Sequence, residues 1–139
     1  MREYTPEVIN ELPENGIFVF GSNTEGRHGK GAALVARQKF GAIYGQASRL
    51  QGKSYAIITK DLKKGLKSIE LSLILNQLIV FSDFAKDNMN LKFYVTKLGS
   101  SLAGYKVEEI KNLFTEINNE ILISDNIILP KEYEVRNDE

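Results

Sequence analysis

The sequence predicts one α/β domain of three layers, with helices on both faces of a mostly parallel, mixed central sheet. Three observations lead to this fold class. Helical and strand-like segments alternate, the strand segments are continuous apolar runs, and the connections between them are too short for separate domains. Such alternation implies right-handed crossovers, which place helices on both faces of the sheet. The chain of 139 residues fits a single domain, residues 1–139, with a charged tail from about residue 131.

The first predicted elements are a short helix and a central strand. Thr5 can cap a helix and Pro6 suits the first helical position, so we expect a helix that continues to about Leu12. After a turn, the run from Ile17 to Phe20 is apolar at every position. Such a run is typical of a strand covered on both faces.

The next predicted elements are a helix and a second strand. Ala33, Ala36 and Phe40 recur at helical spacing, so we expect a helix from about Gly29 to Phe40, ended by Gly41. Residues 44–53 show no clear period and are predicted to form a loop. Residues 54–59 give the second strand.

The rest of the chain alternates in the same way. Residues 60–67 carry four lysines and predict an exposed loop. Ser72 is expected to cap a strongly apolar, well-buried helix that ends near Asp87. A third strand at 91–96, a helix with an apolar stripe from Val107 to Ile117, and a last strand at 126–129 complete the prediction.

Composition limits the classes of function. There are 18 basic and 18 acidic residues, so we expect no chain-wide attraction for nucleic acid or anionic lipid. The absence of cysteine excludes disulfides and thiolate metal sites. The amino terminus lacks the apolar core of a signal peptide, and the most apolar stretch, residues 71–84, is interrupted by polar residues. We therefore expect a cytoplasmic protein without membrane partners.

Small and polar residues follow the first predicted strand directly. Because the carboxyl ends of parallel strands meet at one edge of a sheet, we expect them to line a ligand crevice there. Glycines admit a close ligand, and free amide groups at a helix start favour anions, so the loop predicts a phosphate cradle. The alternative is a tight turn that needs glycine for geometry alone. The residues predicted to bind ligand are Gly21, Ser22, Asn23, Gly29, Lys30, Gly31 and Ala32.

A second small-residue loop follows the third predicted strand. If this loop faces the first one, the two would bind a diphosphate from opposite sides. Tyr105 would then stack on a sugar or base of the ligand. The alternative is an ordinary connector. The residues of this loop are Gly99, Ser100, Ser101, Leu102, Ala103, Gly104 and Tyr105.

Three residues are candidates for catalysis. Lys60 and Asp61 leave the end of a predicted buried strand, where Lys60 would pair with phosphate or act as an amine nucleophile. The alternative for Lys60 is a solvated loop lysine. His28, the only histidine, is a candidate proton-transferring group, although a lone histidine is more often a packing residue. Arg27, Lys30 and Lys97 add positive charge near the same edge.

These motifs resemble the macro domain superfamily, whose members bind ADP-ribose and in several branches hydrolyse ADP-ribosyl bonds. The resemblance extends from about Ile17 to Pro130 and agrees with the predicted fold. Residues 20–23, Phe-Gly-Ser-Asn, are similar to the family's asparagine-containing loop, which implies that Asn23 contacts the distal ribose. Residues 29–33 resemble its glycine-rich stretch, and residues 99–105 its late phosphate-binding loop.

Within the superfamily the chain is similar to the branch of terminal ADP-ribose glycohydrolases, and also to small bacterial and phage proteins with related signatures. Residues 58–60, Ile-Thr-Lys, match the branch motif whose lysine attacks the anomeric carbon, which implies that role for Lys60. Ala103 stands where that branch carries an assisting aspartate.

The resemblance and the residues together predict a domain that binds ADP-ribose or a related nucleotide diphosphate, free or attached to a macromolecule, without a metal or redox cofactor. One interpretation adds hydrolysis of an ADP-ribosyl linkage. A third interpretation is a non-catalytic interaction or scaffold domain whose glycine loops are structural.

Overall fold

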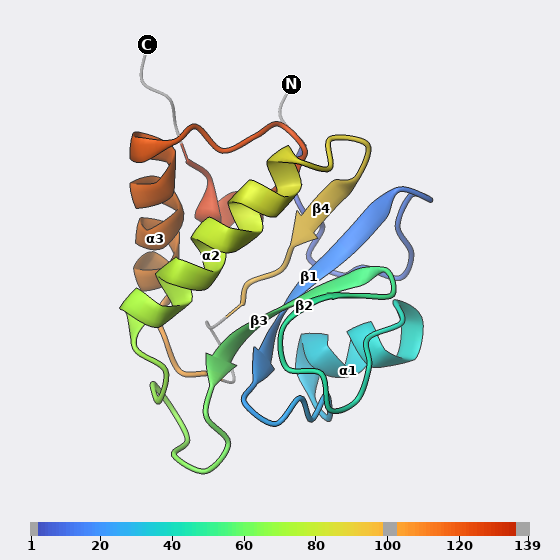
Figure 1. The fold of residues 1–139 in the computed structure, drawn as a ribbon, viewed down its shortest axis with the longest axis vertical. Coiled ribbons are helices and arrows are strands. Elements are labelled where there is room, and N and C mark those ends of the chain that lie inside the picture. The colour runs from blue at the N-terminus through green and yellow to red at the C-terminus, as the bar shows by residue number, and fades with distance from the viewer. Residues whose placement is uncertain (1–2, 99–102, 136–139) are drawn as a thin grey trace.

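A five-stranded mixed sheet forms the centre of the molecule in the computed structural model, which describes residues 3–98 and 103–135 (Figure 1). Its strand order is β2-β3-β1-β4-β5, with every neighbouring pair parallel except β2 and β3. The fold class expected from the sequence is therefore confirmed. The strands are β1 (Gly16–Asn23), β2 (Arg49–Gln51), β3 (Ser54–Lys60), β4 (Lys92–Val95) and β5 (Ile127–Ile128).

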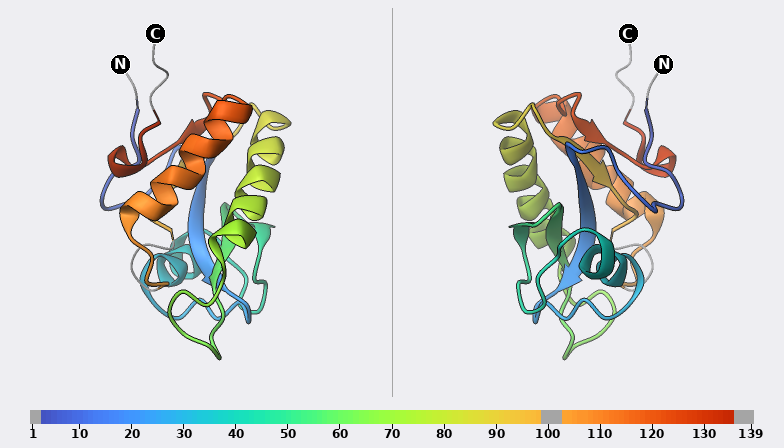
Figure 2. Two further views of the ribbon diagram at one scale, coloured as in Figure 1. Left: turned by 90° about the vertical axis from the view of Figure 1, so that its left-hand side faces the viewer. Right: turned by 90° about the vertical axis from the view of Figure 1, so that its right-hand side faces the viewer.

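Helices cover both faces of this sheet. α1 (Gly31–Lys39) lies on one face, and α2 (Leu71–Lys86) and α3 (Val107–Glu120) lie on the other (Figure 2). The core is divided accordingly. A small cluster that includes Phe18 and Phe40 lies under α1, and a larger one that includes Phe81 and Phe114 lies under α2 and α3.

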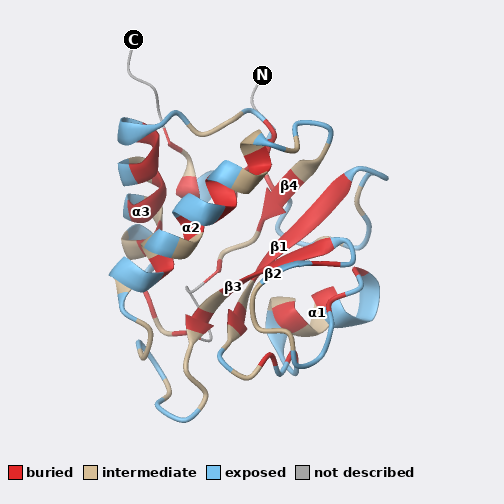
Figure 3. Cartoon of the chain, viewed as in Figure 1, coloured by how far each residue is buried: buried red, intermediate tan, exposed pale blue. Residues whose placement is uncertain are grey.

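The predicted apolar patterns explain why the main elements form where they do. Residues 17–20 of β1 are all buried, as a strand covered on both faces requires (Figure 3). In α2 the residues at helical spacing, Ile74, Leu78, Phe81 and Ala85, have no exposed surface. The outer face of α2 differs from the prediction, because Leu73 and Val80 are largely exposed.

The helix predicted from Thr5 to Leu12 does not form. The Thr5 backbone N–H donates to the carbonyl of Leu129, and its hydroxyl donates to the carbonyl of Ile128. Thr5 therefore does not cap a helix. It holds the amino-terminal segment beside β5. A helix of eight residues is also too short to be stable without tertiary packing.

Two smaller differences concern β2 and the start of α2. β2 lies within the predicted loop at 44–53, where its three residues pair with β3 at the edge of the sheet. Arg49 and Leu50 are exposed, so no apolar pattern marks this strand. The residue before α2 is Glu70, and Ser72 lies inside the first turn instead of capping it.

The segment from residue 131, expected as a charged tail, contributes to the core as far as residue 135. It contains a short 3-10 helix, η1 (Lys131–Tyr133), whose Tyr133 is 0% exposed. The Tyr133 ring stacks on Phe114, and its hydroxyl donates to the carbonyl of Leu98. Among the described residues, no helix combines the length and apolar character that crossing a bilayer would require.

Candidate functional site

The sheet has a switch point between β1 and β4. From the end of β1 the chain turns through α1 toward β2 and β3, whereas from the end of β4 it turns through α3 toward β5. The connections leaving these neighbouring strands therefore diverge at their carboxyl ends. Open α/β sheets bind ligands at such a point. β1 extends three residues beyond its predicted end at Phe20, so Gly21, Ser22 and Asn23 belong to the strand and not to the loop after it. The first predicted loop continues from the end of β1 at this edge, and the segment that leads to the second begins after Val95.

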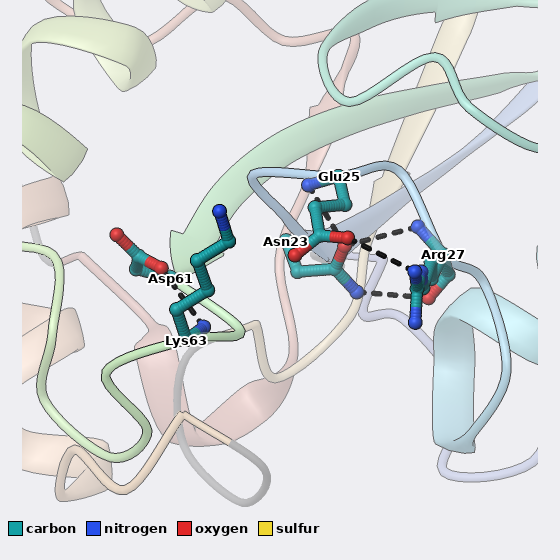
Figure 4. Close-up of polar contacts among 5 residues, drawn as sticks. All are labelled: Asn23, Glu25, Arg27, Asp61 and Lys63. Carbon is teal, nitrogen blue, oxygen red and sulfur yellow. Dashed lines mark hydrogen bonds and ion pairs between the residues drawn. The ribbon is translucent and has the colours of Figure 1, made fainter.

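Asn23, at the end of β1, organises the first loop. Its amide oxygen accepts the backbone N–H groups of Arg27 at 2.9 Å and Glu25 at 3.2 Å, and its amide nitrogen donates to the Arg27 carbonyl at 2.8 Å (Figure 4). Two backbone groups thus use the amide oxygen and one uses the amide nitrogen, so the second N–H of the Asn23 amide has no partner among residues 3–98 and 103–135. The loop is thus held by the same side chain that the sequence analysis assigned to ligand binding.

Ser22 and His28 face the interior beneath this loop. The Ser22 hydroxyl lies 3.4 Å from His28 Nε2, and the Ser22 carbonyl accepts the hydroxyl of Thr59 at 3.3 Å. Gly21 pairs with β3 in the sheet. Ser22 therefore supports the loop from below, through its side chain and its backbone.

His28 is 0% exposed, and its ring packs edge-on against Phe20. Burial is the main cause that lowers the pKa of His28, opposed by the nearby backbone of Gln46. Its Nδ1 forms no hydrogen bond within residues 3–98 and 103–135. The structure thus places the imidazole in the core under the loop.

The amino-terminal end of α1 lies at the switch point with free amide groups. No side chain caps the helix at Lys30, and its first turn contains no acidic residue. Gly31 has a φ of +56°, a conformation that favours glycine, and a Cβ at Gly29 would meet no atom within 4 Å. α3 differs, because its first turn contains Glu108 and Glu109, and Glu109 accepts the Lys106 backbone N–H. α2 resembles α1 in both respects, except that its capping position is the acidic residue Glu70. The start of α1, which follows the loop after β1, is therefore the candidate anion site at the switch point.

A cavity of about 340 Å³ adjoins the first turn of α1. Phe18 of β1 and Ala32 and Val35 of α1 give it an apolar wall, while Thr96 and Lys97 border it just after β4. The segment from Thr5 to Asn10 forms the opposite wall. Sequence reasoning missed that wall, because a threonine–proline pair suits a helix start as well as an extended segment.

Lys97 forms ion pairs that join the segment from Thr5 to Asn10 to the end of β4 and to η1. Its ammonium group lies 2.8 Å from a Glu7 carboxylate oxygen and 2.9 Å from one of Glu132. These carboxylates raise the pKa of Lys97 above its ordinary value. The charge that the sequence analysis assigned to the crevice edge is thus shared with two protein carboxylates.

Lys60 and Asp61 lie at the end of β3, beside the Asn23 loop. Lys60 is the register partner of Asn23, and its carbonyl accepts the backbone N–H of Thr24. The Lys60 ammonium has no hydrogen bond or ion pair with any residue that the structure describes. Asp61 starts a turn, where its carboxylate accepts the Lys63 backbone N–H at 3.0 Å (Figure 4).

The second predicted loop is described only in part, since Gly99, Ser100, Ser101 and Leu102 lie outside the described residues. Ala103 is buried, and its carbonyl accepts the Lys67 backbone N–H. Gly104 has a φ of +88°. Tyr105 is buried, and its hydroxyl donates to the carbonyl of Ile69. This end of the loop is therefore joined to the lysine-rich loop at 60–69, and the Tyr105 ring is not presented to solvent.

Metal ligands do not gather in the described part of the chain: it contains no group of three or more histidine, cysteine or carboxylate residues placed to hold an ion. The chemistry available at the switch point is therefore that of backbone amides, the Asn23 amide and the Lys60 amine.

Solved structures match the chain, and two of them superpose on most of its length. The macrodomain of Mycobacterium tuberculosis DarG superposes with a TM-score of 0.64 at 18% identity, covering 94% of this chain and 97% of that one. The chain has the macrodomain fold. A protein of unknown function from Bacteroides thetaiotaomicron superposes with a TM-score of 0.59 at 20% identity, covering 87% of this chain and 90% of that one.

The macrodomain fold confirms the resemblance that the sequence motifs indicated, at the level of architecture. No protein-family model matches the chain, and no curated protein matches it. At 18–20% identity the likeness concerns the fold alone. The branch within the superfamily and the roles of the individual site residues stay predictions.

Proposed function

We propose that this chain binds ADP-ribose or a related nucleotide diphosphate at the β1/β4 switch point. The observation that carries the proposal is the uncapped start of α1, free of acidic residues, which opens beside an apolar cavity of about 340 Å³. The macrodomain fold supports the same ligand class. The diphosphate would accept hydrogen bonds from the amide groups of Gly31 and Ala32.

The two ends of the ligand would lie on either side of this helix end. The cavity offers the apolar surface that a nucleobase requires, through Phe18, Ala32 and Val35. The distal ribose would then lie near Asn23 and Lys60, which are neighbours in the sheet register. The remaining N–H of the Asn23 amide would donate to a ribose hydroxyl.

Calorimetry with ADP-ribose tests the binding proposal. Gly29→Ala puts a methyl group where the ligand would pass but where no protein atom lies within 4 Å. We expect affinity to fall by about tenfold, corresponding to about 1.4 kcal/mol, with the unfolding midpoint unchanged. Gln38→Ala, on the exposed surface of the same helix, is the matched control and should bind like wild type.

Several outcomes would count against the proposal. Absence of measurable binding of ADP-ribose and AMP by the wild-type protein would favour the scaffold interpretation. Equal affinity of Gly29→Ala and Gln38→Ala for ADP-ribose would instead show that the ligand does not bind at the start of α1.

A second function, hydrolysis of an ADP-ribosyl linkage, is favoured by the free ammonium of Lys60 next to Asn23. Lys60 would act as a nucleophile or electrostatic stabiliser at the anomeric carbon, with Asp61 or His28 as candidate proton-transferring groups. Ala103 removes the carboxylate found in the glycohydrolase branch that the chain resembles, so proton transfer would depend mainly on Asp61, because His28 has no exposed surface.

Release of ADP-ribose from modified protein, modified nucleic acid and acetylated ADP-ribose tests this function. Lys60→Arg keeps the positive charge but not the nucleophilic amine, so it separates the two roles of Lys60. We expect Lys60→Ala to abolish release and Lys63→Ala, in the neighbouring turn, to preserve it. Equal release by wild type and Lys60→Ala would exclude the hydrolytic function.

A further inference from the structure

Charge is distributed very unevenly along this neutral chain. Residues 26–67 contain ten of its 18 basic residues and only one of its 18 acidic residues, Asp61. The rest of the chain is correspondingly acidic. Zero net charge therefore does not imply an even surface, because one segment has a large excess of basic residues.

The fold brings the loops of this basic segment to one end of the molecule. The loop after β1 contacts the end of β3 through the Thr24 backbone N–H and the Lys60 carbonyl, 3.0 Å apart. It also contacts the loop after α1 through the Gly45 backbone N–H and the Gly26 carbonyl, 2.9 Å apart. All three loops lie together at the lower end of Figure 1, where the carboxyl ends of β1 and β3 point.

Six exposed basic residues on these loops and on α1 form what we call the basic rim. Lys30 directly precedes α1, and Arg37 lies in the last turn of that helix. Carboxylates offset little of this charge, since Glu25 pairs with Arg27 at 3.2 Å and Asp61 accepts a backbone N–H of its own turn. The basic rim consists of Arg27, Lys30, Arg37, Lys63, Lys64 and Lys67.

An exposed aromatic ring lies within this surface. Tyr44 is 58% exposed, and the Arg37 guanidinium lies over its ring, 5.5 Å from the centroid. The neighbouring Ile43 is 52% exposed. A flat ring beside guanidinium and ammonium groups is the combination on which unpaired bases stack while the backbone phosphates are neutralised.

We propose that the basic rim docks a single-stranded nucleic acid, whose backbone passes the mouth of the switch-point site. Tyr44 favours a single strand over a duplex, because a duplex keeps the faces of its bases stacked inside. The ring likewise favours nucleic acid over an acidic peptide, which has charge but few flat groups. The basic rim shares only Lys30 with the residues predicted to bind ligand at the switch point, and the proposal does not depend on the ligand proposed there.

Fluorescence anisotropy with a labelled single strand of about 12 nucleotides tests the proposal. Binding is measured at about 50 mM and about 200 mM salt for wild type and for two charge-matched double variants. One is Lys63→Glu with Lys64→Glu in the basic rim. The other is Lys111→Glu with Lys131→Glu, on α3 and η1, as the control. None of these four residues belongs to the proposed switch-point site.

We expect the basic-rim variant to bind about tenfold more weakly at low salt, with a log–log salt slope shallower by about one to two. The control variant should remain within about twofold of wild type. Tyr44→Ala should lose about tenfold and Tyr44→Phe should not, because stacking needs the ring and not the hydroxyl. Thermal unfolding of each variant verifies that it is folded.

Three results would overturn the proposal. The first is equal weakening by the two double variants, and the second is the absence of binding even at low salt. The third is unchanged binding of Tyr44→Ala together with equal competition by polyglutamate or anionic vesicles, which would show a general attraction for polyanions. Since no ADP-ribose is added, failure here leaves the switch-point proposal untouched.

Discussion

At the scale of single residues, three amide side chains supply hydrogen bonds to backbone groups of neighbouring segments. Asn23 closes the loop after β1, Gln77 binds the edge of β3, and Asn126 joins the end of α2 to the start of β4. The Asn126 amide nitrogen lies 2.9, 3.2 and 3.1 Å from the carbonyl oxygens of Ala85, Asn88 and Leu91. One buried side chain thus fixes the turn that leads into a central strand.

Replacing Asn126 with alanine should therefore destabilise the fold. Its three carbonyl partners would lose their donor in a buried environment, at a cost of about 2 kcal/mol. Urea unfolding monitored by circular dichroism measures this change. Asn126→Asp keeps the shape but cannot donate when ionised, so it should be at least as destabilised. Wild-type stability of the aspartate variant would contradict the assignment.

The buried His28 predicts a pH dependence of stability. Burial lowers its folded-state pKa below the ordinary histidine value of 6.5, so the unfolded state binds a proton at a higher pH than the folded state does. The contribution of His28 is fully present above pH 6.5 and is lost as pH falls from there through the folded-state pKa. Because the chain has one histidine, His28→Gln should flatten the unfolding free energy over that range. An unchanged profile in the variant would refute the prediction.

At the scale of elements, β3 shows how an open sheet edge is closed. β2 pairs with β3 only as far as Ala56, so Ile58 has no strand neighbour on that side. The Gln77 amide of α2 accepts the Ile58 N–H and donates to the Ile58 carbonyl, both at 2.7 Å. A glutamine side chain thus takes the place of a further strand and covers an edge that would otherwise be free to pair.

Gln77→Ala should cost about 1–2 kcal/mol, since it removes both hydrogen bonds from a half-buried backbone unit. Gln77→Glu keeps the acceptor but not the donor and should lie between alanine and wild type. Denaturant unfolding gives the free energies, and light scattering shows whether the freed edge promotes association. An alanine variant as stable as wild type would show that water replaces the amide fully.

Two glycines of the first loop should differ sharply in their tolerance of alanine. Gly26 has a φ of +65°, and an added Cβ would lie 2.6 Å from the Gly45 backbone, whereas Gly29 has open space. Gly26→Ala should thus lose at least about 1 kcal/mol of stability, and Gly29→Ala almost none. Thermal melts of the two variants compare them directly. Equal melting temperatures would mean that the loop relaxes around the new methyl group.

At the scale of the whole molecule, the two ends of the chain close the larger core and the cavity wall. Thr5 is bonded to β5, Glu7 and Glu132 share Lys97, and Tyr133 stacks on Phe114. The terminal segments therefore hold the switch point from the side opposite α1. They also carry part of the acidic charge that balances the basic segment at 26–67.

Removal of the residues after Pro130 should accordingly destabilise the molecule by at least about 3 kcal/mol, because the deletion uncovers Phe114 and empties the site of Tyr133. Tyr133→Phe loses only hydroxyl interactions, including that with Leu98, and should cost about 1 kcal/mol. Denaturant unfolding of both proteins tests the ranking. A truncated protein of wild-type stability would show that the segment is dispensable.

Local patterns were sufficient for much of the fold. The runs at 17–20 and 54–59 were predicted as strands because every residue on them is apolar or small, and the stripe from Val107 to Ile117 predicted α3. The three-residue β2 and the path of residues 5–12 were not predictable in this way. β2 has two exposed residues out of three and so no apolar pattern, and it is fixed by pairing with β3, whereas residue 5 is fixed by Leu129, far away in the sequence.

The candidate site also has features that local sequence patterns predict and features that depend on tertiary packing. The sequence by itself determined the alternating α/β order and the glycine loop that opens α1, because apolar periodicity and the conformational freedom of glycine are local properties. Only the tertiary structure decided that His28 and Tyr105 are buried, that the terminal segments wall the cavity, and that the basic loops share one end of the molecule. The burial of a side chain and the charged groups around it depend on which distant segments pack together. A local sequence pattern does not contain this information.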